Sequence, residues 1–529
     1  MAEKDFNLLF EQWIRVLNGE GEAEEISLLD FFRRAHELKS IAGELATQDV
    51  AMLRLLLAVV YAVFTRVDAD GKRFSLKNMT DALGRWKQIW KLDKFPYEVI
   101  EKYFKHYHDR FYLFHPERPF YQVPALNIGT DYFAAKLMGD LSESGNKVRL
   151  FPIRTGKGKG YVGKAEAARW LLHLNAFDDA SSKPKGEGLP SPGTGWLGKL
   201  GIVFAVGANM FETLMLNFAL ADEHSNVFEE GKAAWEQEKA NKEERVKISA
   251  PTSMLELLTL QSRRIMLLKT PDGGYISGYR LLGGDFFDEE NAFIEQMTLW
   301  RAKKEKNNII FLPKFHDPAR FLWQDFPALT VKNSEHKQPG IVHWIAVLKS
   351  HGLTNHKLAS FQTASIKYGA NNSAVADAFS DYIKLNAGLL TELGGEYAAM
   401  VVDLLDKTAK CVKVLGDLAN DIAEAGGSDA KNINGIGEQV REQAYFSLDK
   451  PFRNWLADVD PGKNDIAVVA GGWLQQMKKI VTTQGQQIFA EAGEKAFVGR
   501  YKEVKGKRVA QTAARAFLRF EKEIMKITG

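Results

Sequence analysis

Glycines and cations gather in one stretch of the chain, Gly145 to Gly201, where eleven glycines and ten Lys or Arg share 57 residues with four Asp or Glu. Glycine has no Cβ, so its backbone can approach a ligand closely. Clustered cations attract phosphate groups. The stretch therefore predicts contact with phosphates, either of a nucleotide or of a nucleic-acid backbone.

A nucleotide site is the first alternative, because Gly158 to Lys164 has the spacing of a phosphate-binding P-loop and its glycines also fit GxGxxG. A P-loop needs Ser or Thr after its Lys to hold Mg²⁺, and here that position is Ala165. A dinucleotide site needs an acidic residue after a second strand, whereas Asp178 and Asp179 follow a run with the pattern of a continuing helix. A nucleotide hydrolase using Gly158 to Lys164 remains the alternative function, and a basic, mobile loop is the favoured interpretation.

The composition of the whole chain is that of a globular protein with several domains. Its 529 residues are 45% hydrophobic and 26% charged, with a formal net charge of +3. A nucleic-acid surface must therefore be a local patch. A second basic segment is Arg500 to Gly529, which carries nine Lys or Arg against three acids.

Metal sites, disulfides and membrane spans are not expected. The single Cys411 excludes an internal disulfide and a multi-cysteine zinc site, and it is expected to fill a helical core. His106, His108 and His115 lack a carboxylate or Cys at ligand spacing. The longest apolar run, Leu55 to Phe64, is about half a bilayer span. We expect a cytoplasmic protein without cofactor, metal or membrane contact.

The first two thirds of the chain mix helix and strand patterns. Apolar spacing and turn residues predict the following elements: a short β element within 5–18, helices over 27–40 and 49–67, a buried element over 207–220, a solvated helix or connector over 228–247, a helix capped by Ser253 within 252–268, and a hairpin or strand pair over 275–285.

From Ser373 the pattern changes to apolar residues three or four positions apart, which predicts a helix through Leu405. Three further helical segments follow, over 432–457, 465–491 and 505–527. Four amphipathic helices with short connections form a four-helix bundle. We therefore predict an α+β chain with a mixed α/β domain over 1–370 and a four-helix bundle over 371–529.

Five motifs, in order along nearly the full length, resemble the large subunit of the type I-E CRISPR Cascade surveillance complex, the CasA family. They are Phe6 to Ile14 (FNLLFEQWI), Phe111 to Phe120 (FYLFHPERPF), Gly193 to Gly198 (GTGWLG), Leu257 to Ile265 (LLTLQSRRI) and Met297 to Arg301 (MTLWR).

The resemblance implies a role in recognition and not in catalysis. Members of this family have a mixed α/β domain and a C-terminal four-helix bundle. They read the protospacer-adjacent motif on double-stranded DNA, help to open the duplex beside it, and support recruitment of the helicase-nuclease. The CRISPR RNA then reads the target by base pairing. The implied partners are double-stranded DNA, the CRISPR RNA, other Cascade subunits and the helicase-nuclease.

The resemblance also implies three DNA- or guide-contacting elements in this chain. Gly193 and Gly195 correspond to a glycine loop that approaches the minor groove, which is about 6 Å wide. An Asp at either glycine is expected to weaken duplex binding and to leave the fold intact. Asn371, Asn372 and Ser373 correspond to a wedge that replaces the first target base pair, where unstacking costs a few kcal/mol. Phe151, Pro152 and Ile153, after Leu150, correspond to a loop that engages the guide.

Further candidate DNA contacts are the cations Lys157, Lys159, Lys164 and Arg280. The family has a motif-contacting lysine near the position of Tyr279 to Asp285, and this stretch has Arg280 and no Lys. Where some relatives have a zinc knuckle, this chain has Pro271 to Gly274, so no zinc is expected. A third function class, a bundle protein that binds only proteins, predicts no salt-dependent DNA binding.

Overall fold

The structure is a computed structural model of the chain that describes residues 4–529 except 144–147, 149, 239–241, 306–307, 333–335, 464 and 505–506. For residues 430–432, 502, 504 and 507 it describes the backbone alone. The start of the glycine-rich stretch, at 145–147 and 149, thus lies outside the described residues. The chain forms two compact units. The first contains 1–318, 332–353 and 360–382, and the second contains 319–331, 354–359 and 383–529.

The core of the first unit is built around helix α2, Ala46–Phe64. Nearly all of its side chains are buried, and it packs against α7 (Lys164–Phe177), α8 (Met210–Asn217) and α9 (Met254–Leu258). Helix α2 is also long and apolar enough to span a membrane, but 94% of its most apolar window is buried inside the fold. Its apolar surface is therefore used for packing.

Small antiparallel sheets surround this core. Strand β9 pairs on its two sides with β6 and β8, and β2 pairs with β3 and β4. The strands of the first unit are β1 (Asp5–Asn7), β2 (Ile14–Asn18), β3 (Ala23–Ile26), β4 (Leu38–Ile41), β5 (Tyr112–Phe114), β6 (Thr130–Phe133), β7 (Phe204–Ala205), β8 (Arg263–Lys269), β9 (Ile276–Gly283), β10 (Trp300–Glu305) and β11 (Asn308–Pro313). Its other helices are α1 (Leu28–Arg34), α3 (Met79–Trp90), α4 (Tyr97–Tyr107), α5 (Ala134–Leu137), α6 (Lys157–Gly160) and α11 (Gly340–Ser350).

Several predicted elements of this unit are confirmed, and others need correction. The β element, the 49–67 helix and the buried 207–220 element are present. The range 275–285 holds the single strand β9 and not a hairpin or strand pair, because its partners β6 and β8 lie outside that range. The predicted helix over 27–40 ends at Arg34 and gives way to β4. Ser253 caps α9 as expected, but that helix stops at Leu258 and the chain continues as strand β8. Of the two alternatives for 228–247, the described residues agree with a connector and not with a solvated helix, because they contain only the short 3₁₀ turn Ala234–Glu236, and Ala233 and Trp235 are buried.

The predicted helix starting at Ser373 is wrong for its first part. Leu358–Tyr368 and Val375–Asn386 form strands β12 and β13, which are neighbours in a sheet with β7. In β13, Ile383 and Leu385 are both buried and two positions apart, which is the strand period. The helical spacing resumes only at Gly395. Residues 371–373 therefore lie in a β-turn region and not at a helix start.

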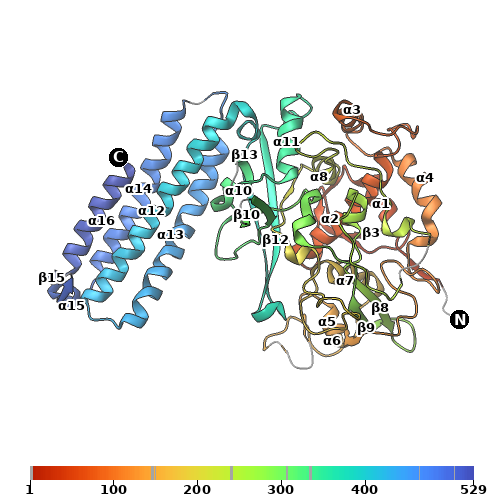
Figure 1. Cartoon of the computed structure of the whole chain (residues 1–529), viewed down its shortest axis with the longest axis horizontal. Helices are drawn as coiled ribbons and strands as arrows, with labels where there is room; N and C mark the ends of the chain where they lie inside the picture. Colours follow the sequence, from red (N-terminus) through yellow and green to blue (C-terminus); the bar gives the residue numbers. More distant parts are fainter. Residues whose placement is uncertain are drawn as a thin grey trace. The chain divides into compact units, whose positions relative to one another are not determined.

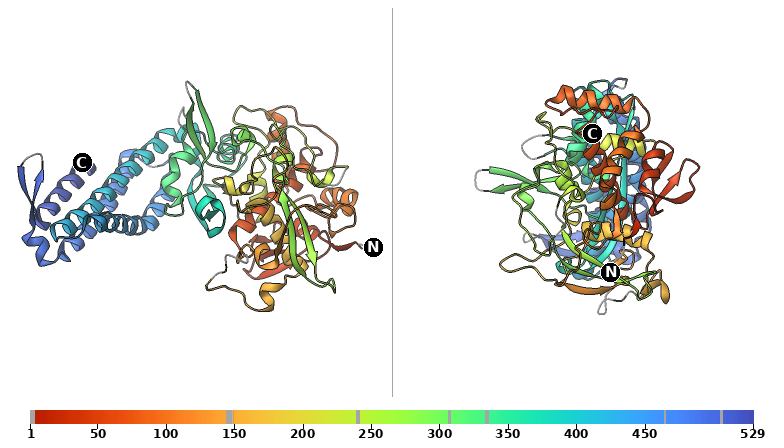
Figure 2. Two further views of the ribbon diagram at one scale, coloured as in Figure 1. Left: turned by 60° about the horizontal axis from the view of Figure 1, so that its bottom comes forward. Right: turned by 90° about the vertical axis from the view of Figure 1, so that its right-hand side faces the viewer.

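The second unit contains a four-helix bundle, in agreement with the prediction. Helices α12 (Gly395–Ala425), α13 (Ala430–Asp458), α14 (Ile466–Ala490) and α16 (Ala513–Thr528) run alongside one another in Figures 1 and 2. Trp473, Met477 and Val481 of α14 are fully buried at a spacing of four. Cys411 is buried in α12, and burial raises the pKa of its thiol to about 12. The unit also contains α10 (Phe326–Thr330), α15 (Glu494–Val498) and a hairpin of β14 (Arg500–Val504) and β15 (Lys507–Gln511).

Candidate nucleic-acid interface

The two candidate glycines differ in their surroundings. Gly193 has a positive φ of 65°, and a Cβ at this position would come no closer than 4.0 Å to another atom, the Cε of Lys199. Glycine is favoured here by the backbone conformation and not by crowding. The space around Gly193 is open, as a loop that approaches a ligand requires.

Gly195 is buried and closely packed. A Cβ on Gly195 would lie 2.3 Å from the carbonyl oxygen of Ala176 and 2.9 Å from the nitrogen of Phe177. Both neighbours are backbone atoms at the end of α7, and they cannot move aside as a side chain could. The expectation that Asp at Gly195 leaves the fold intact is therefore wrong, because any side chain there displaces the end of the helix.

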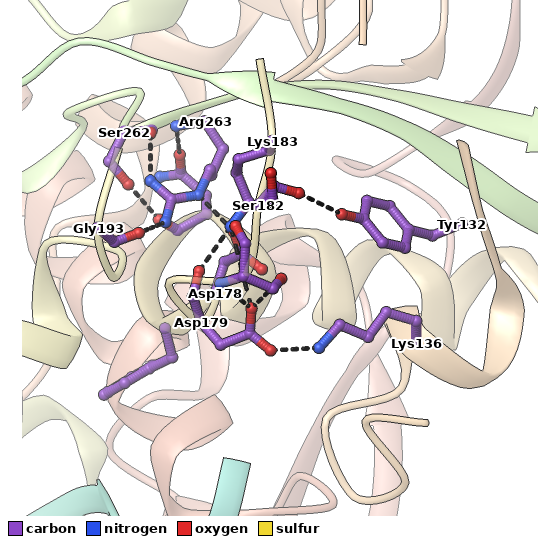
Figure 3. A network of polar contacts seen from close by, with 12 residues as sticks. Tyr132, Lys136, Asp178, Asp179, Ser182, Lys183, Gly193, Ser262 and Arg263 are labelled. Carbon is purple, nitrogen blue, oxygen red and sulfur yellow. Dashed lines mark hydrogen bonds and ion pairs between the residues drawn. The ribbon is translucent and has the colours of Figure 1, made fainter. Parts of the chain in front are cut away.

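Hydrogen bonds to buried groups fix the loop in place. The carbonyl of Gly193 accepts from Nη2 of Arg263 at 2.6 Å, and the Gly195 amide donates to the carbonyl of Asp178 at 2.9 Å. Arg263 is the first residue of β8, and its Nε also donates to Oδ2 of Asp178 at 2.5 Å. The loop is thus attached to Asp178 directly, through the Gly195 amide. It is also attached through Arg263, which contacts both Gly193 and Asp178 (Figure 3).

The candidate wedge residues form the turn between β12 and β13. Asn371 and Asn372 have φ values of 55° and 53°, in the left-handed region that Asn tolerates better than most residues. Both are exposed, and the Ser373 hydroxyl donates to the carbonyl of Ala370 at 3.0 Å. Two short amides thus project from a tight turn whose geometry selects Asn or Gly.

The wedge turn and the glycine loop contact the same segment, Phe177 to Lys183. The Tyr368 hydroxyl donates to the carbonyl of Phe177 at 2.7 Å, and the Ala180 amide donates to the carbonyl of Asn372 at 2.7 Å. This is also the segment whose Asp178 carbonyl binds Gly195. The structure therefore brings together two candidate elements that lie almost 180 residues apart in the sequence.

A buried cluster of charges connects that segment with its neighbours (Figure 3). Nζ of Lys183 donates to the carbonyls of Asp179 at 2.6 Å and Ser181 at 3.0 Å, and it lies 3.0 Å from Oδ2 of Asp178. Lys136 pairs with the carboxylate of Asp179. The four charged side chains, those of Lys136, Asp178, Asp179 and Lys183, are at most 8% exposed. Together with Arg263, the cluster joins α5, β8 and the end of α7.

The charges of this cluster stabilise one another. Burial alone would raise the pKa of Asp178, but Arg263, Lys183 and Lys136 outweigh that effect and hold the pKa below its ordinary value. Burial lowers the pKa of Lys183, and Asp178 opposes the shift. Removing one partner of such a buried pair typically costs about 3–5 kcal/mol, because the other charge is left uncompensated.

The candidate guide loop exposes apolar side chains. Leu150, Phe151 and Ile153 are 90%, 93% and 73% exposed, respectively, and Pro152 between them is partly exposed. The loop is anchored after Ile153, where Arg154 pairs with Asp140 and Glu166 at 2.8 and 2.7 Å. Apolar side chains gathered on an exposed loop are typical of a contact with another protein or a ligand.

Three of the four candidate cations already have carboxylate partners. Nζ of Lys159 lies 2.7 Å from Glu143, Nζ of Lys164 lies 2.8 Å from Asp5, and Arg280 binds both oxygens of Asp131 at 2.6 and 2.9 Å. Lys157 is exposed and has no ion-pair partner among the described residues. Of the four, Lys157 is therefore the cation that can meet a phosphate without breaking an existing pair.

The P-loop alternative lacks the surrounding architecture that its chemistry needs. Lys157–Gly160 is a single helical turn, and Gly163 precedes α7 in an extended conformation. The described residues of the preceding apolar segment, Val148 and Leu150–Ile153, form no strand. Since the Lys164 amine is held by Asp5, it is not directed into a glycine cradle.

Sequence patterns did not identify the buried charge cluster. In the sequence, Asp178 and Asp179 follow the wrong element for a dinucleotide site, and Arg263 is one residue of the LLTLQSRRI motif. The i to i+4 spacing of Asp179 and Lys183 in a glycine- and proline-rich loop was the available signal. Their partner Arg263 is 85 residues from Asp178, and no local pattern relates the two.

Comparison with known proteins identifies the family. The family model described as CRISPR-associated protein Cse1 matches residues 7–484. The chain belongs to the Cse1 family. CasA/Cse1 of Thermus thermophilus is 27% identical over 428 residues, which cover 79% of this chain and 78% of that protein.

Solved structures agree with this assignment. The crystal structure of Thermobifida fusca Cse1 matches with a TM-score of 0.84 and 28% identity, over 99% of this chain and 98% of that one. A chain of a solved CRISPR RNA-guided surveillance complex matches with a TM-score of 0.71 over 99% of this chain and 100% of that one, and at 16% identity this shows a shared fold. The α+β fold class and the resemblance to the large subunit of type I-E Cascade are confirmed, and the chain is a CRISPR-associated protein of the Cse1 family.

Proposed function

We propose that this chain is the non-catalytic subunit that recognises the protospacer-adjacent motif on double-stranded DNA and opens the duplex beside it. The observation that carries the proposal is the common attachment of the Gly193 loop and the Asn371–Asn372 turn to Phe177–Lys183. A loop that reads a motif and a wedge that replaces the next base pair must act on adjacent base steps, and both elements are held by one short segment.

The open space at Gly193 supports a minor-groove approach by the loop. The exposed amides of Asn371 and Asn372 support the wedge role, because short polar side chains can occupy the space of a base pair and bond to base edges. Phe151 and Ile153 are proposed to contact the guide end of the complex, and Lys157 to contact a DNA phosphate. We further propose a cytoplasmic location, and that the bound complex recruits the helicase-nuclease through this chain.

The decisive experiment reconstitutes the surveillance complex with and without this chain. Binding to duplex targets with the correct motif, with a scrambled motif, and to a single-stranded target is measured at several salt concentrations. The expected result is that omission abolishes discrimination between the two duplexes and changes single-stranded binding little. Equal affinities and equal discrimination in both preparations would overturn the proposal.

A separate assay tests the nucleotide-hydrolase alternative. The purified chain is incubated with ATP or GTP and Mg²⁺, beside a Lys164→Ala variant and a Lys157→Ala control. No turnover above the buffer rate is expected in any sample. Turnover that disappears in Lys164→Ala and persists in Lys157→Ala would favour the alternative.

A further inference from the structure

The segment Phe177–Lys183 follows α7 and contains no helix or strand beyond Phe177. Its position must therefore come from other contacts. The structure provides these through Lys183, whose amine binds two carbonyls of the same segment and the carboxylate of Asp178. One buried amine thus closes the segment into a compact turn.

The same turn is bound from two further directions. Arg263 of β8 connects Asp178 with the carbonyl of Gly193, and Lys136 of α5 pairs with Asp179 (Figure 3). The turn presents the Ala180 amide to the carbonyl of Asn372. Displacement of Asp178 or Lys183 would therefore shift the glycine loop and the wedge turn together.

A gain in folding stability does not by itself account for this buried charge cluster. Buried ion pairs of this kind are often no more stabilising than apolar side chains of the same size, but they fix geometry because each charge requires its partner. Five charged groups in one buried cluster therefore indicate that the geometry of this turn matters. The two elements it holds are the ones assigned to motif reading and to strand opening.

We propose that the Asp178–Lys183–Arg263 cluster is a positioning device that sets the spacing between the glycine loop and the wedge turn, so that strand opening depends on this cluster. Asp178, Lys183 and Arg263 are positioning residues in this inference, which rests on the proposed function above. All three side chains are buried. Arg263 and Asp178 act through the backbone of Gly193 and Gly195, and Lys183 acts through the 177–183 turn whose Ala180 amide binds Asn372. The inference predicts that the wedge loses its effect when the cluster is broken.

The test is a double-mutant comparison in the reconstituted complex. Lys183→Met keeps the length of the side chain and removes its charge, and Lys185→Met removes the same charge from an exposed position in the same loop. Each is combined with Asn371→Gly plus Asn372→Gly, which removes the wedge amides and keeps the left-handed turn. Opening is measured as the fluorescence of a base analogue in the first pair beside the motif.

In the otherwise unchanged chain, removal of the wedge amides is expected to reduce opening about tenfold. In the Lys185→Met background the same loss is expected. In the Lys183→Met background opening is already reduced by a similar factor, and removal of the amides changes it less than about twofold. A full additional loss in the Lys183→Met background would overturn the inference.

A second variant covers the case in which Lys183→Met does not fold. Ala180→Pro removes the single amide N–H that binds the Asn372 carbonyl, and Ser182→Pro places the same ring where the described residues show no bond from the amide. Reduced opening in Ala180→Pro, but not in Ser182→Pro, is the expected result. Wild-type opening in both overturns the inference while the proposed function stands.

A different outcome would overturn the proposed function itself. If Gly193→Asp and the Asn371→Gly plus Asn372→Gly pair leave binding and opening unchanged in the wild-type background, the proposed function fails and the inference fails with it.

Discussion

Gly195 lies so close to Ala176 that a Cβ on the glycine would be 2.3 Å from the carbonyl oxygen of Ala176. Two residues earlier, Gly193 has open space around it. The two glycines of one motif therefore serve different purposes. Gly195 lets the loop pack on the end of α7, and Gly193 leaves the outer face of the loop without a side chain. Substitutions at Gly195 should therefore change stability, and substitutions at Gly193 should change DNA binding.

Gly195→Ala is expected to destabilise the fold by about 1–3 kcal/mol, because overpacking against the backbone of Ala176 displaces the helix end.

Gly193→Asp is expected to leave the melting temperature within a few degrees of wild type, because Asp tolerates the left-handed region, and to weaken duplex binding by at least about tenfold. Gly193→Asn, which has the same size without the charge, separates bulk from repulsion. Thermal unfolding and duplex binding are measured on the same preparations. A Gly193→Asp complex with wild-type affinity would remove Gly193 from the interface.

The wedge turn requires substitutions that respect its backbone. Asn371 and Asn372 both have positive φ, so Ala at these positions adds strain of roughly 1–2 kcal/mol each and confuses loss of the amides with distortion of the turn. The Gly pair is expected to impair binding of intact duplex by about tenfold, and to bind a duplex already mismatched beside the motif as well as wild type does. Comparable losses on both substrates would contradict the wedge assignment.

Local patterns predicted the bundle and the mixed first domain, because helices such as α14 bury Trp473, Met477 and Val481 at a regular spacing. They failed at β13, where Phe379, Tyr382 and Ile383 imitate helical spacing although the segment pairs as a strand. Pairing between strands is a non-local property, and short runs do not distinguish the two periods.

The candidate site also depends on contacts that local sequence patterns do not predict. Gly193 and Asn372 were found by family resemblance, whereas their common attachment to Asp178 and Ala180 depends on contacts between distant segments.

The candidate cations are expected to differ in their contribution to DNA binding. Lys157→Ala should weaken duplex binding and reduce the slope of log affinity against log salt concentration by about 1, because one exposed phosphate contact is lost. Lys159→Ala should change the slope less, since Lys159 already pairs with Glu143 at 2.7 Å. The measurement is a salt titration of duplex binding by the reconstituted complex. Equal slopes in wild type and Lys157→Ala would show that Lys157 does not contact phosphate.

Asp49, in the first turn of α2, gives the fold a pH dependence that is independent of DNA. Burial raises the pKa of this carboxyl to about 6, although the Gly43 amide donates to its Oδ1 at 2.7 Å. The folded state therefore binds the proton more tightly than the unfolded chain, whose Asp pKa is about 3.9. The favourable contribution of Asp49 is complete below about pH 4 and is lost as pH rises to about 6.

The buried imidazole of His173 acts in the opposite direction. Burial lowers the pKa of His173 to about 4, so folding is penalised as pH falls from about 6.5 towards 4. The two effects partly cancel in the wild-type chain between pH 4 and 6. Asp49→Asn keeps an oxygen that accepts from the Gly43 amide and removes the titration of Asp49, so that only the effect of His173 is left. The variant should be more stable than wild type by roughly 3 kcal/mol at pH 7.5 and no more stable at pH 4. Urea unfolding of both proteins across this pH range measures the difference, and a constant difference at all pH values would show that Asp49 does not titrate in the folded state as inferred.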